Sequence, residues 1–417
     1  MKRYAMMVLG CKVNDYEAHY LKDRLDKEYQ EVKFNEEADI YIIFTCCVTN
    51  VAEAKTRKFI HRVKREHPNA YLVVVGCYVQ ARHDSEVLKD IDLIVGSQYK
   101  DKIKEYIDQG IKADLYKEEI DRHFETLPLN TYKGKTRSFL KVQDGCDQYC
   151  SYCVIPYARG HERSGDIDEL YHQAEVLAEH SKEIVLTGIH TGRYKDKGNR
   201  LSDLIARLEK IETIETIRLS SIEVTEVDDD IIRRIKEGKL APHLHIPLQA
   251  GSDTVLKDMH RPYTIEEYKR RIFKIREEVP EILISTDLIV GYPTETDELF
   301  EETLENLKDL RFSFIHCFPY AKKSGTKAAL LKDLGTDIKK ERARRVAALD
   351  VKIAGELQES YLNKTLEVLI EEKKEGFSFG HSKEYLPLYV MGDHPSGDLL
   401  KIKVIKVKDG KMIGEVE

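Results

Sequence analysis

Short apolar runs alternate with helical segments along most of the chain, and this alternation restricts the fold more than any other feature. Four runs in residues 1–115 have the length and composition of buried strands: YAMMVLG, ADIYIIFTC, YLVVVGC and IDLIVG. The segments between them have helical periodicity. Parallel strands joined by helical crossovers form open α/β sheets, so we expect a doubly wound parallel-sheet domain over residues 1–115.

A second series of the same kind follows. Six further runs read as strands between residues 132 and 353: FLKVQ, EIVLTG, TIRLSS, HLHIPLQ, ILISTDLIVG and FSFIHCFPY. Six βα units are too few to close the eight-stranded barrel that such units usually form. We therefore expect an open, partial (β/α)6 barrel over residues 132–353, joined to the first domain by a polar linker at about residues 116–135.

The last part of the chain has a different pattern. A long helical segment, DIKKERARRVAALDVKIAGELQESYLN, leads into short alternating runs separated by Gly, Pro and Asp: TLEVLIEE, PLYVM and LLKIKVIKV. This pattern is typical of a small antiparallel β-barrel, which we expect over residues 356–417. A chain of 417 residues is long enough to bury three separate cores.

The charge balance excludes a protein that binds nucleic acid through a strong overall positive field, because the formal net charge is −7. Any RNA contact must use local patches. Two helical segments are candidates, although each is also explained as a solvated helix face. The first carries Lys55, Arg57, Lys58, Arg62, Lys64 and Arg65, and the second carries Lys339, Lys340, Arg342, Arg344 and Arg345.

The eight cysteines are too few for a disulfide scaffold in a chain of this length. The apolar run near the N-terminus is too short for a signal peptide or a membrane span. We therefore expect a cytoplasmic protein with no membrane partner, in which reduced cysteines bind metal or lie buried.

The strongest local signal is a CxxxCxxC loop formed by Cys146, Cys150 and Cys153 directly after a predicted strand. Three thiolates can hold three irons of a [4Fe-4S] cluster and leave the fourth iron open to another ligand. The alternative is a zinc site that lacks its fourth ligand.

Three other cysteines, Cys11, Cys46 and Cys77, each lie at the carboxyl end of a different predicted strand in the first domain. Ligands bind at this edge of open α/β sheets. Single cysteines are also common as small buried residues, so the pattern leaves both a second metal site and a buried core open. Cys317 lies inside a predicted strand and is expected to be buried, and Cys47 should point away from its neighbour Cys46.

Polar residues and glycines follow the later strands of the second series, where an α/β barrel places its active site. Each of them is also explained as a turn residue or a helix cap. They are Thr187, Gly188, Ser221, Glu223, Gln249, Ser252, Asp287 and Gly291.

Several long motifs occur together and in order: LGCKVN, TCCVTNVAEAKTRK, VGCY, DGCDQYCSYC, LTGIHTGRY, RLSSIE, HLHIPLQAGSD and FPYAKKSGT. Over its whole length the chain thereby resembles the radical-SAM methylthiotransferases, which have an N-terminal cluster domain, a radical-SAM core and a C-terminal TRAM domain that binds RNA. The resemblance implies two [4Fe-4S] clusters and S-adenosylmethionine as cofactors. It assigns Cys146, Cys150 and Cys153 to the radical-SAM cluster and Cys11, Cys46 and Cys77 to an auxiliary cluster, and it assigns the eight polar residues and glycines above to the S-adenosylmethionine pocket.

Within this family the CKVN and CVTNVAEAKTRK segments are similar to the branch that adds a methylthio group to carbon 2 of N6-threonylcarbamoyladenosine, at position 37 beside the tRNA anticodon. The isopentenyladenosine branch typically has CQMN, and a third branch modifies an aspartate of a ribosomal protein. An iron-sulfur RNA-binding protein without catalysis is the alternative from another class. The resemblance also implies an electron donor of flavodoxin or ferredoxin type and a sulfur source that the sequence does not identify.

Three positions depart from the family pattern: Phe44 replaces an Asn, Ala250 replaces a common Ser, and Thr294 replaces a common Gly. None of them removes a predicted ligand. Cys46 holds the cysteine place of the usual NTC motif, but Cys47 directly after it leaves swapped ligation open.

Overall fold

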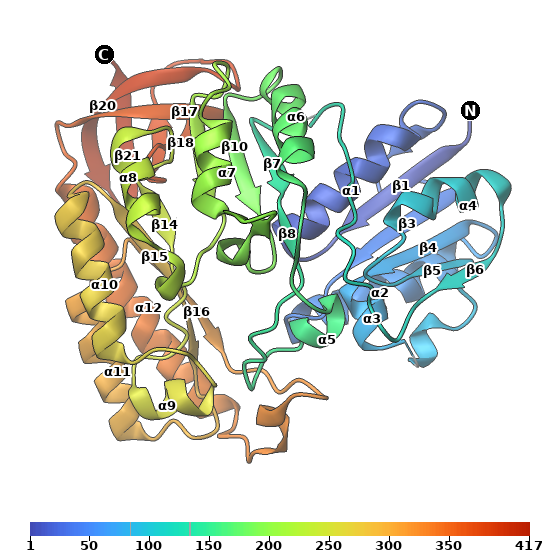
Figure 1. Cartoon of the computed structure of the whole chain (residues 1–417), viewed down its shortest axis with the longest axis horizontal. Coiled ribbons are helices and arrows are strands. Elements are labelled where there is room, and N and C mark those ends of the chain that lie inside the picture. The colour runs from blue at the N-terminus through green and yellow to red at the C-terminus, as the bar shows by residue number, and fades with distance from the viewer. Residues whose placement is uncertain (84, 133–134) are drawn as a thin grey trace.

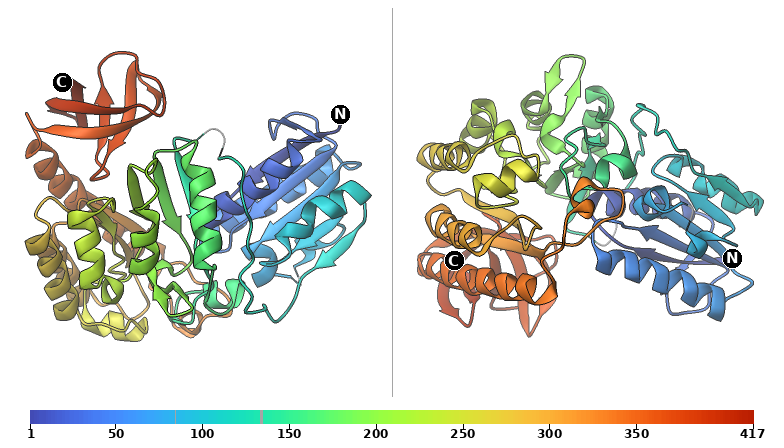
Figure 2. Two further views of the ribbon diagram at one scale, coloured as in Figure 1. Left: turned by 45° about the horizontal axis from the view of Figure 1, so that its top comes forward. Right: turned by 90° about the horizontal axis from the view of Figure 1, so that it is seen from below.

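The computed structural model describes residues 1–83, 85–132 and 135–417. They form three units in chain order, and the N-terminal sheet and the C-terminal barrel lie on opposite sides of the central unit (Figures 1 and 2). Among the helices of these described residues, none combines the length and the apolar character needed to cross a membrane.

The N-terminal unit is a parallel sheet with strand order β2-β1-β3-β4-β5-β6, as a doubly wound fold requires. Its strands are β1 (Arg3–Val8), β2 (Gln30–Val32), β3 (Ile40–Thr45), β4 (Tyr71–Gly76), β5 (Leu93–Val95) and β6 (Ala113–Leu115). Its helices are α1 (Lys12–Leu25), α2 (Asn50–Glu66), α3 (Cys77–Ala81) and α4 (Ile103–Gln109). The prediction is confirmed, but it missed the edge strands β2 and β6, which are short and only partly buried.

The carboxyl ends of β3 and β4 approach each other closely. Gly76 ends β4 with a φ of 109°, and a Cβ atom there would lie 3.1 Å from the carbonyl oxygen of Thr45 at the end of β3. Glycine adopts this positive φ readily, and it has no Cβ atom that would contact the carbonyl oxygen. The glycine therefore brings Cys77, the next residue, beside the Cys46–Cys47 segment.

The connection at residues 116–132 contains no helix or strand, as predicted, but it is not a free linker. Leu127, Leu129 and Tyr132 are buried. The Tyr16 hydroxyl of α1 donates to the carbonyl of Leu127 at 2.8 Å, and the Tyr132 hydroxyl donates to Asp15 at 2.5 Å. The segment thus fastens α1 to the central unit.

The central unit is the predicted open barrel. Its six main strands form two parallel sheets, β13-β10-β7 and β14-β15-β16, which leave β7 and β16 as the two free edges of the barrel. The strands are β7 (Arg137–Lys141), β10 (Glu183–Thr187), β13 (Thr216–Leu219), β14 (His243–His245), β15 (Leu283–Val290) and β16 (Phe314–Pro319). The covering helices are α6 (Ile167–Ala178), α7 (Leu201–Leu208), α8 (Asp229–Glu237), α10 (Ile265–Glu278) and α11 (Asp297–Leu310).

Shorter elements complete the loops of this unit. They are β8 (Gln143–Asp144), α5 (Ile155–Arg159), β9 (Arg163–Ser164), β11 (Lys195–Asp196), β12 (Asn199–Arg200) and α9 (Asp253–Asp258). Two of them, β8 and α5, flank the CxxxCxxC loop.

The connector helix α12 (Thr336–Glu359) packs against β16, where Asp350 accepts a hydrogen bond from the Ile315 amide at 2.9 Å. Three of the five basic residues in the predicted patch form ion pairs: Lys339 with Asp333, Arg342 with Glu295 and Asp297, and Arg345 with Glu301. The other two, Lys340 and Arg344, are exposed. The predicted phosphate-binding patch on the connector therefore keeps only Lys340 and Arg344 as exposed cations. On α2, likewise, Arg57, Arg62 and Arg65 form ion pairs with Glu53 and Glu66, and Lys55 and Lys58 are exposed.

The C-terminal unit is a closed barrel with strand order β17-β18-β19-β21-β20. The strands are β17 (Thr365–Lys374), β18 (Phe377–Ser382), β19 (Pro387–Val390), β20 (Leu399–Lys408) and β21 (Lys411–Val416). All pairs are antiparallel except β19 with β21, which run parallel. The predicted small β-barrel is confirmed with this one difference.

Candidate metal centres

The CxxxCxxC loop lies between β8 and α5, and N–H groups point at all three of its sulfur atoms. The Gln148 amide donates to Cys146 Sγ and the Ile155 amide donates to Cys153 Sγ, each at 3.4 Å. The Arg261 guanidinium donates to Cys150 Sγ at 3.3 Å. Donors of this kind stabilise thiolate, which is the form that binds iron.

The N-terminal cysteines have the same kind of surroundings. The Val48 amide donates to Cys46 Sγ at 3.4 Å, and Arg159 Nε donates to Cys77 Sγ at 3.0 Å. Cys11 caps the N-terminus of α1. Burial raises the pKa of its thiol, and the positive charge of Arg159 and the amides of Asn14 and Val13 oppose that rise.

Cys47 and Cys317 differ from the six predicted ligands. In the parts of the chain that the structure describes, no N–H group donates to either sulfur. Cys47 is completely buried, and its thiol interacts with Cys77. The hydrogen bond from Cys47 lowers the pKa of the Cys77 thiol, and the positive charge of Arg159 lowers it further. Together they outweigh burial, which raises the pKa, and bring it to about 6. The geometry therefore favours Cys46 over Cys47 as a ligand.

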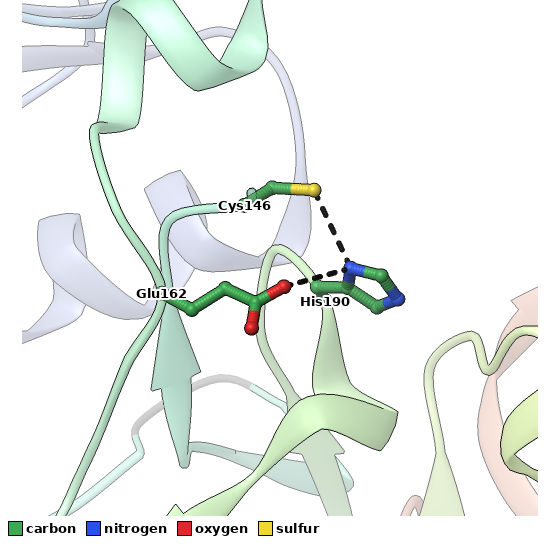
Figure 3. A group of neighbouring side chains, drawn as sticks. All are labelled: Cys146, Glu162 and His190. Atoms are coloured by element: carbon green, nitrogen blue, oxygen red, sulfur yellow. Dashed lines mark hydrogen bonds and ion pairs between the residues drawn. The ribbon is translucent and has the colours of Figure 1, made fainter. Parts of the chain in front are cut away.

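His190 and Glu162 lie beside Cys146 of the loop (Figure 3). The His190 Nδ1 atom lies 3.3 Å from Cys146 Sγ and 3.5 Å from a Glu162 carboxylate oxygen, and its Nε2 lies 2.8 Å from Glu226. Burial by itself would lower the pKa of His190, but its bonds to Cys146 and Glu226 outweigh burial and raise the pKa to about 10.

A protonated imidazole has no free lone pair and cannot ligate a metal. In the protein without a bound metal, His190 is therefore placed to donate a hydrogen bond to Cys146, and together with Cys146 and Glu162 it also has the spacing of a possible metal-binding group. The donor set of each cysteine group consists of three thiols that form no disulfide, each with an N–H donor. Such a set fits a [4Fe-4S] cluster with one open iron.

One buried arginine joins the two cysteine groups. Arg159 ends α5, is completely buried, and donates to Cys77. Its other nitrogens donate to Glu17 at 2.7 Å and 3.2 Å and to Asn14 at 2.7 Å, both on α1. Burial would raise the pKa of Glu17, but Arg159 and two lysines lower it to about 2. The helix that follows the CxxxCxxC loop is thus fixed to the N-terminal sheet by charge.

Three of the eight residues predicted for the S-adenosylmethionine pocket are connected to the CxxxCxxC loop. Glu223 pairs with Arg261, which also contacts Cys150. Thr187 ends β10 and pairs with Lys141 of β7, the strand that leads toward the loop. Gly188 packs against Gln143, whose side-chain oxygen accepts a hydrogen bond from the His190 amide at 2.7 Å.

The other five differ in their surroundings. Gln249 pairs through its backbone with Asp287, whose carboxylate lies 3.3 Å from His245 on the inner face of the barrel. The Ser252 hydroxyl is buried without a hydrogen-bond partner among the described residues, as expected for a group that a ligand would satisfy. Ser221 is half-buried. Gly291 faces Lys339 of α12, where a Cβ atom would lie 2.2 Å from that side chain, so it has a packing role.

Sequence reasoning missed Arg159, Arg261 and His190. Their partners are distant in sequence: 142 residues separate Arg159 from Glu17, and 111 separate Arg261 from Cys150. The one available signal was the position of Arg159 directly after the cysteine loop, in the segment VIPYARG.

Comparisons with known proteins agree with this geometry. Residues 140–307 match the model of the Radical SAM superfamily, and residues 3–96 match that of the uncharacterized protein family UPF0004. In the solved structures, the radical S-adenosylmethionine methyltransferase TsrM from Kitasatospora setae, with cobalamin and a [4Fe-4S] cluster bound, has the same fold. The two structures superpose with a TM-score of 0.58 and are 14% identical in sequence, and the match covers 79% of this chain and 77% of the TsrM chain.

Curated relatives match over nearly the whole length. The threonylcarbamoyladenosine tRNA methylthiotransferase MtaB of Bacillus subtilis (strain 168) is 37% identical over 100% of this chain and 98% of its own. The MtaB of Aquifex aeolicus (strain VF5) is 41% identical over 89% of this chain and 93% of its own length. A tRNA-2-methylthio-N(6)-dimethylallyladenosine synthase of Thermodesulfovibrio yellowstonii is 32% identical over 98% of this chain and 97% of its own length. On this full-length identity, the chain belongs to the methylthiotransferase family of the radical SAM superfamily.

Proposed function

We propose that the protein adds a methylthio group to carbon 2 of N6-threonylcarbamoyladenosine at position 37 of tRNA. The observation that carries this function is the pair of cysteine groups, each with an N–H donor on every sulfur, held together by Arg159. The relatives named for this activity include the Bacillus subtilis and Aquifex aeolicus proteins.

In this proposal Cys146, Cys150 and Cys153 would hold the radical-SAM cluster, and Cys11, Cys46 and Cys77 would hold the auxiliary cluster. When bound, the two clusters and S-adenosylmethionine supply the radical and sulfur chemistry of the reaction. The protein itself orients the groups. Arg261 and His190 donate to the sulfurs of the first cluster site, and the buried Ser252 hydroxyl is available to a polar group of a ligand.

The reaction also needs an electron from outside the protein. We assign this role to a small donor of flavodoxin or ferredoxin type, because cluster reduction at low potential is the ordinary task of such proteins.

The substrate is tested by incubating the reconstituted, reduced protein with S-adenosylmethionine and two tRNA preparations, one carrying threonylcarbamoyladenosine and one carrying isopentenyladenosine. Mass spectrometry of the digested RNA should show a methylthio adduct on the first alone. An adduct on the second alone would keep the reaction type and reject the substrate. Absence of S-adenosylmethionine cleavage would favour a non-catalytic iron-sulfur RNA-binding protein.

Lys12 is the residue that best suits the threonylcarbamoyl group, which carries a free carboxylate. It directly follows Cys11 at the start of α1 and is half-buried. Within the described residues its ammonium group has no ion pair or hydrogen bond. Burial and the nearby charges of Arg218 and Arg137 lower the pKa of Lys12 to about 8, while Glu183 and Cys11 oppose that change. A carboxylate of the substrate would give this ammonium group a partner.

Replacement of Lys12 by methionine should therefore weaken binding of threonylcarbamoyladenosine tRNA by about 10- to 100-fold, the contribution of a hydrogen bond to a charged group. Binding of the same tRNA with unmodified adenosine, which has no carboxylate, should stay unchanged. Filter binding of the two RNAs to the wild-type and variant proteins measures both. An equal loss for the two RNAs would assign Lys12 to phosphate contact instead.

A further inference from the structure

A row of three aromatic rings lies on the inner face of β16, the free edge strand of the open barrel. Phe314 is 52% exposed and the His316 side chain is 56% exposed, while Phe318 is partly buried. The ring centroids are 5.9 Å apart from Phe314 to His316 and 4.2 Å apart from His316 to Phe318. Large rings exposed in a continuous row point to a binding surface.

The neighbouring strand identifies the face on which this row lies. In β15, Ser285, Asp287 and Ile289 pair in register with the three aromatic residues. The alternate residues of β15, Ile284, Leu288 and Val290, belong to the core beneath the helices. The aromatic row therefore faces the interior of the barrel rather than α12.

The row extends along the strand from one end of the barrel to the other. At about 3.3 Å per residue, Phe314 and Phe318 are separated by about 13 Å. Phe314 begins β16, on the side where Leu283, the first residue of β15, packs into the core of the C-terminal barrel. Phe318 lies toward the carboxyl edge of the strands, the edge at which the CxxxCxxC loop follows β7.

A polar group accompanies the rings. An Asp287 carboxylate oxygen lies 3.6 Å from His316 Nδ1, and the other lies 3.3 Å from His245 Nε2. Carboxylates accept hydrogen bonds from the amino and imino groups of nucleobases. Flat rings beside such an acceptor are suited to stacked, unpaired bases, which single-strand-binding proteins hold in this way.

We propose that the Phe314–His316–Phe318 row is the stacking surface for unpaired anticodon-loop bases of the tRNA, leading from the C-terminal barrel to the cluster edge. The proposal rests on the proposed tRNA substrate. A small ligand bound at the cluster edge would reach Phe318 and not Phe314, because Phe314 is at the opposite end of the strand. A polymer that passes along the inner face contacts all three rings.

Phe314→Ala tests the proposal, because this ring is exposed and far from the cluster edge. The holoprotein and a fluorescein-labelled anticodon stem-loop carrying threonylcarbamoyladenosine are titrated by fluorescence anisotropy at several salt concentrations. Loss of one stacked base should weaken binding by about 5- to 100-fold. The dependence of affinity on salt should keep its slope, since no phosphate contact is removed. Cleavage of S-adenosylmethionine without RNA should be unchanged, and Phe314→Trp should restore the affinity.

Phe273→Ala is the matched control, since Phe273 is 46% exposed on α10 and should bind RNA as the wild type does. Wild-type affinity in Phe314→Ala would overturn the proposal, and so would an equal loss in Phe273→Ala. A parallel loss of S-adenosylmethionine cleavage would assign the ring to that cofactor and overturn it as well. Failure of the proposed function is distinguishable, because it would appear as absence of methylthio product from the wild-type protein in the same preparation.

Discussion

Replacing Arg159 by methionine is expected to destabilise the junction between the N-terminal sheet and the central barrel by about 3–5 kcal/mol, the usual cost of breaking a buried ion pair. The Arg159 side chain is completely buried, and its loss would leave the carboxylate of Glu17 with less compensating charge. It would also remove the donor to Cys77. Urea denaturation of the iron-free protein, followed by circular dichroism, measures the shift.

Two further variants isolate the cause. Arg345→Met removes the ion pair with Glu301, which is exposed, and should cost no more than about 1 kcal/mol. Glu17→Gln combined with Arg159→Met removes the carboxylate that has lost one of its three cationic partners and should recover part of the lost stability. If Arg159→Met unfolds at the same urea concentration as Arg345→Met, the buried network has no structural role.

The second large effect concerns Cys46 and Cys47. Cys46→Ala should abolish methylthio transfer and remove half of the bound iron, because it takes a ligand from the auxiliary site. Cys47→Ala should keep the iron and the product, since no N–H group of the described residues donates to the Cys47 sulfur. Iron quantification and mass spectrometry of the RNA product measure both properties. The reverse pattern would show that Cys47 is the ligand and that the hydrogen bond from Val48 does not mark ligation.

The fold followed from local patterns where those patterns are strong. The buried runs that became β3 and β4 are continuously apolar, so their parallel pairing was predictable, whereas β2 and β6 have three residues each and no distinct pattern. The buried role of residues 116–132 was missed because Leu127, Leu129 and Tyr132 stand among polar residues.

Of the candidate site, only the cysteines were predictable, because their spacing and their positions at strand ends can be identified from the sequence alone. The groups that surround them depend on tertiary contacts. His190 reaches Cys146 across 44 residues and Arg159 reaches Cys77 across 82, and nothing local to either side chain indicates its partner. On the connector helix, acidic partners on other segments neutralise Lys339, Arg342 and Arg345, which a count of charges along the sequence does not reveal.

The most direct test of the two-cluster account is to compare bound iron and sulfide, by chemical analysis and Mössbauer spectroscopy, in three anaerobically reconstituted proteins. These are the wild type, a variant with Cys146, Cys150 and Cys153 replaced by alanine, and one with Cys11, Cys46 and Cys77 replaced. Each variant should retain half of the wild-type iron as a [4Fe-4S] cluster, and only the wild type should form the methylthio product. Full iron content or product formation in either variant would contradict the two-cluster account.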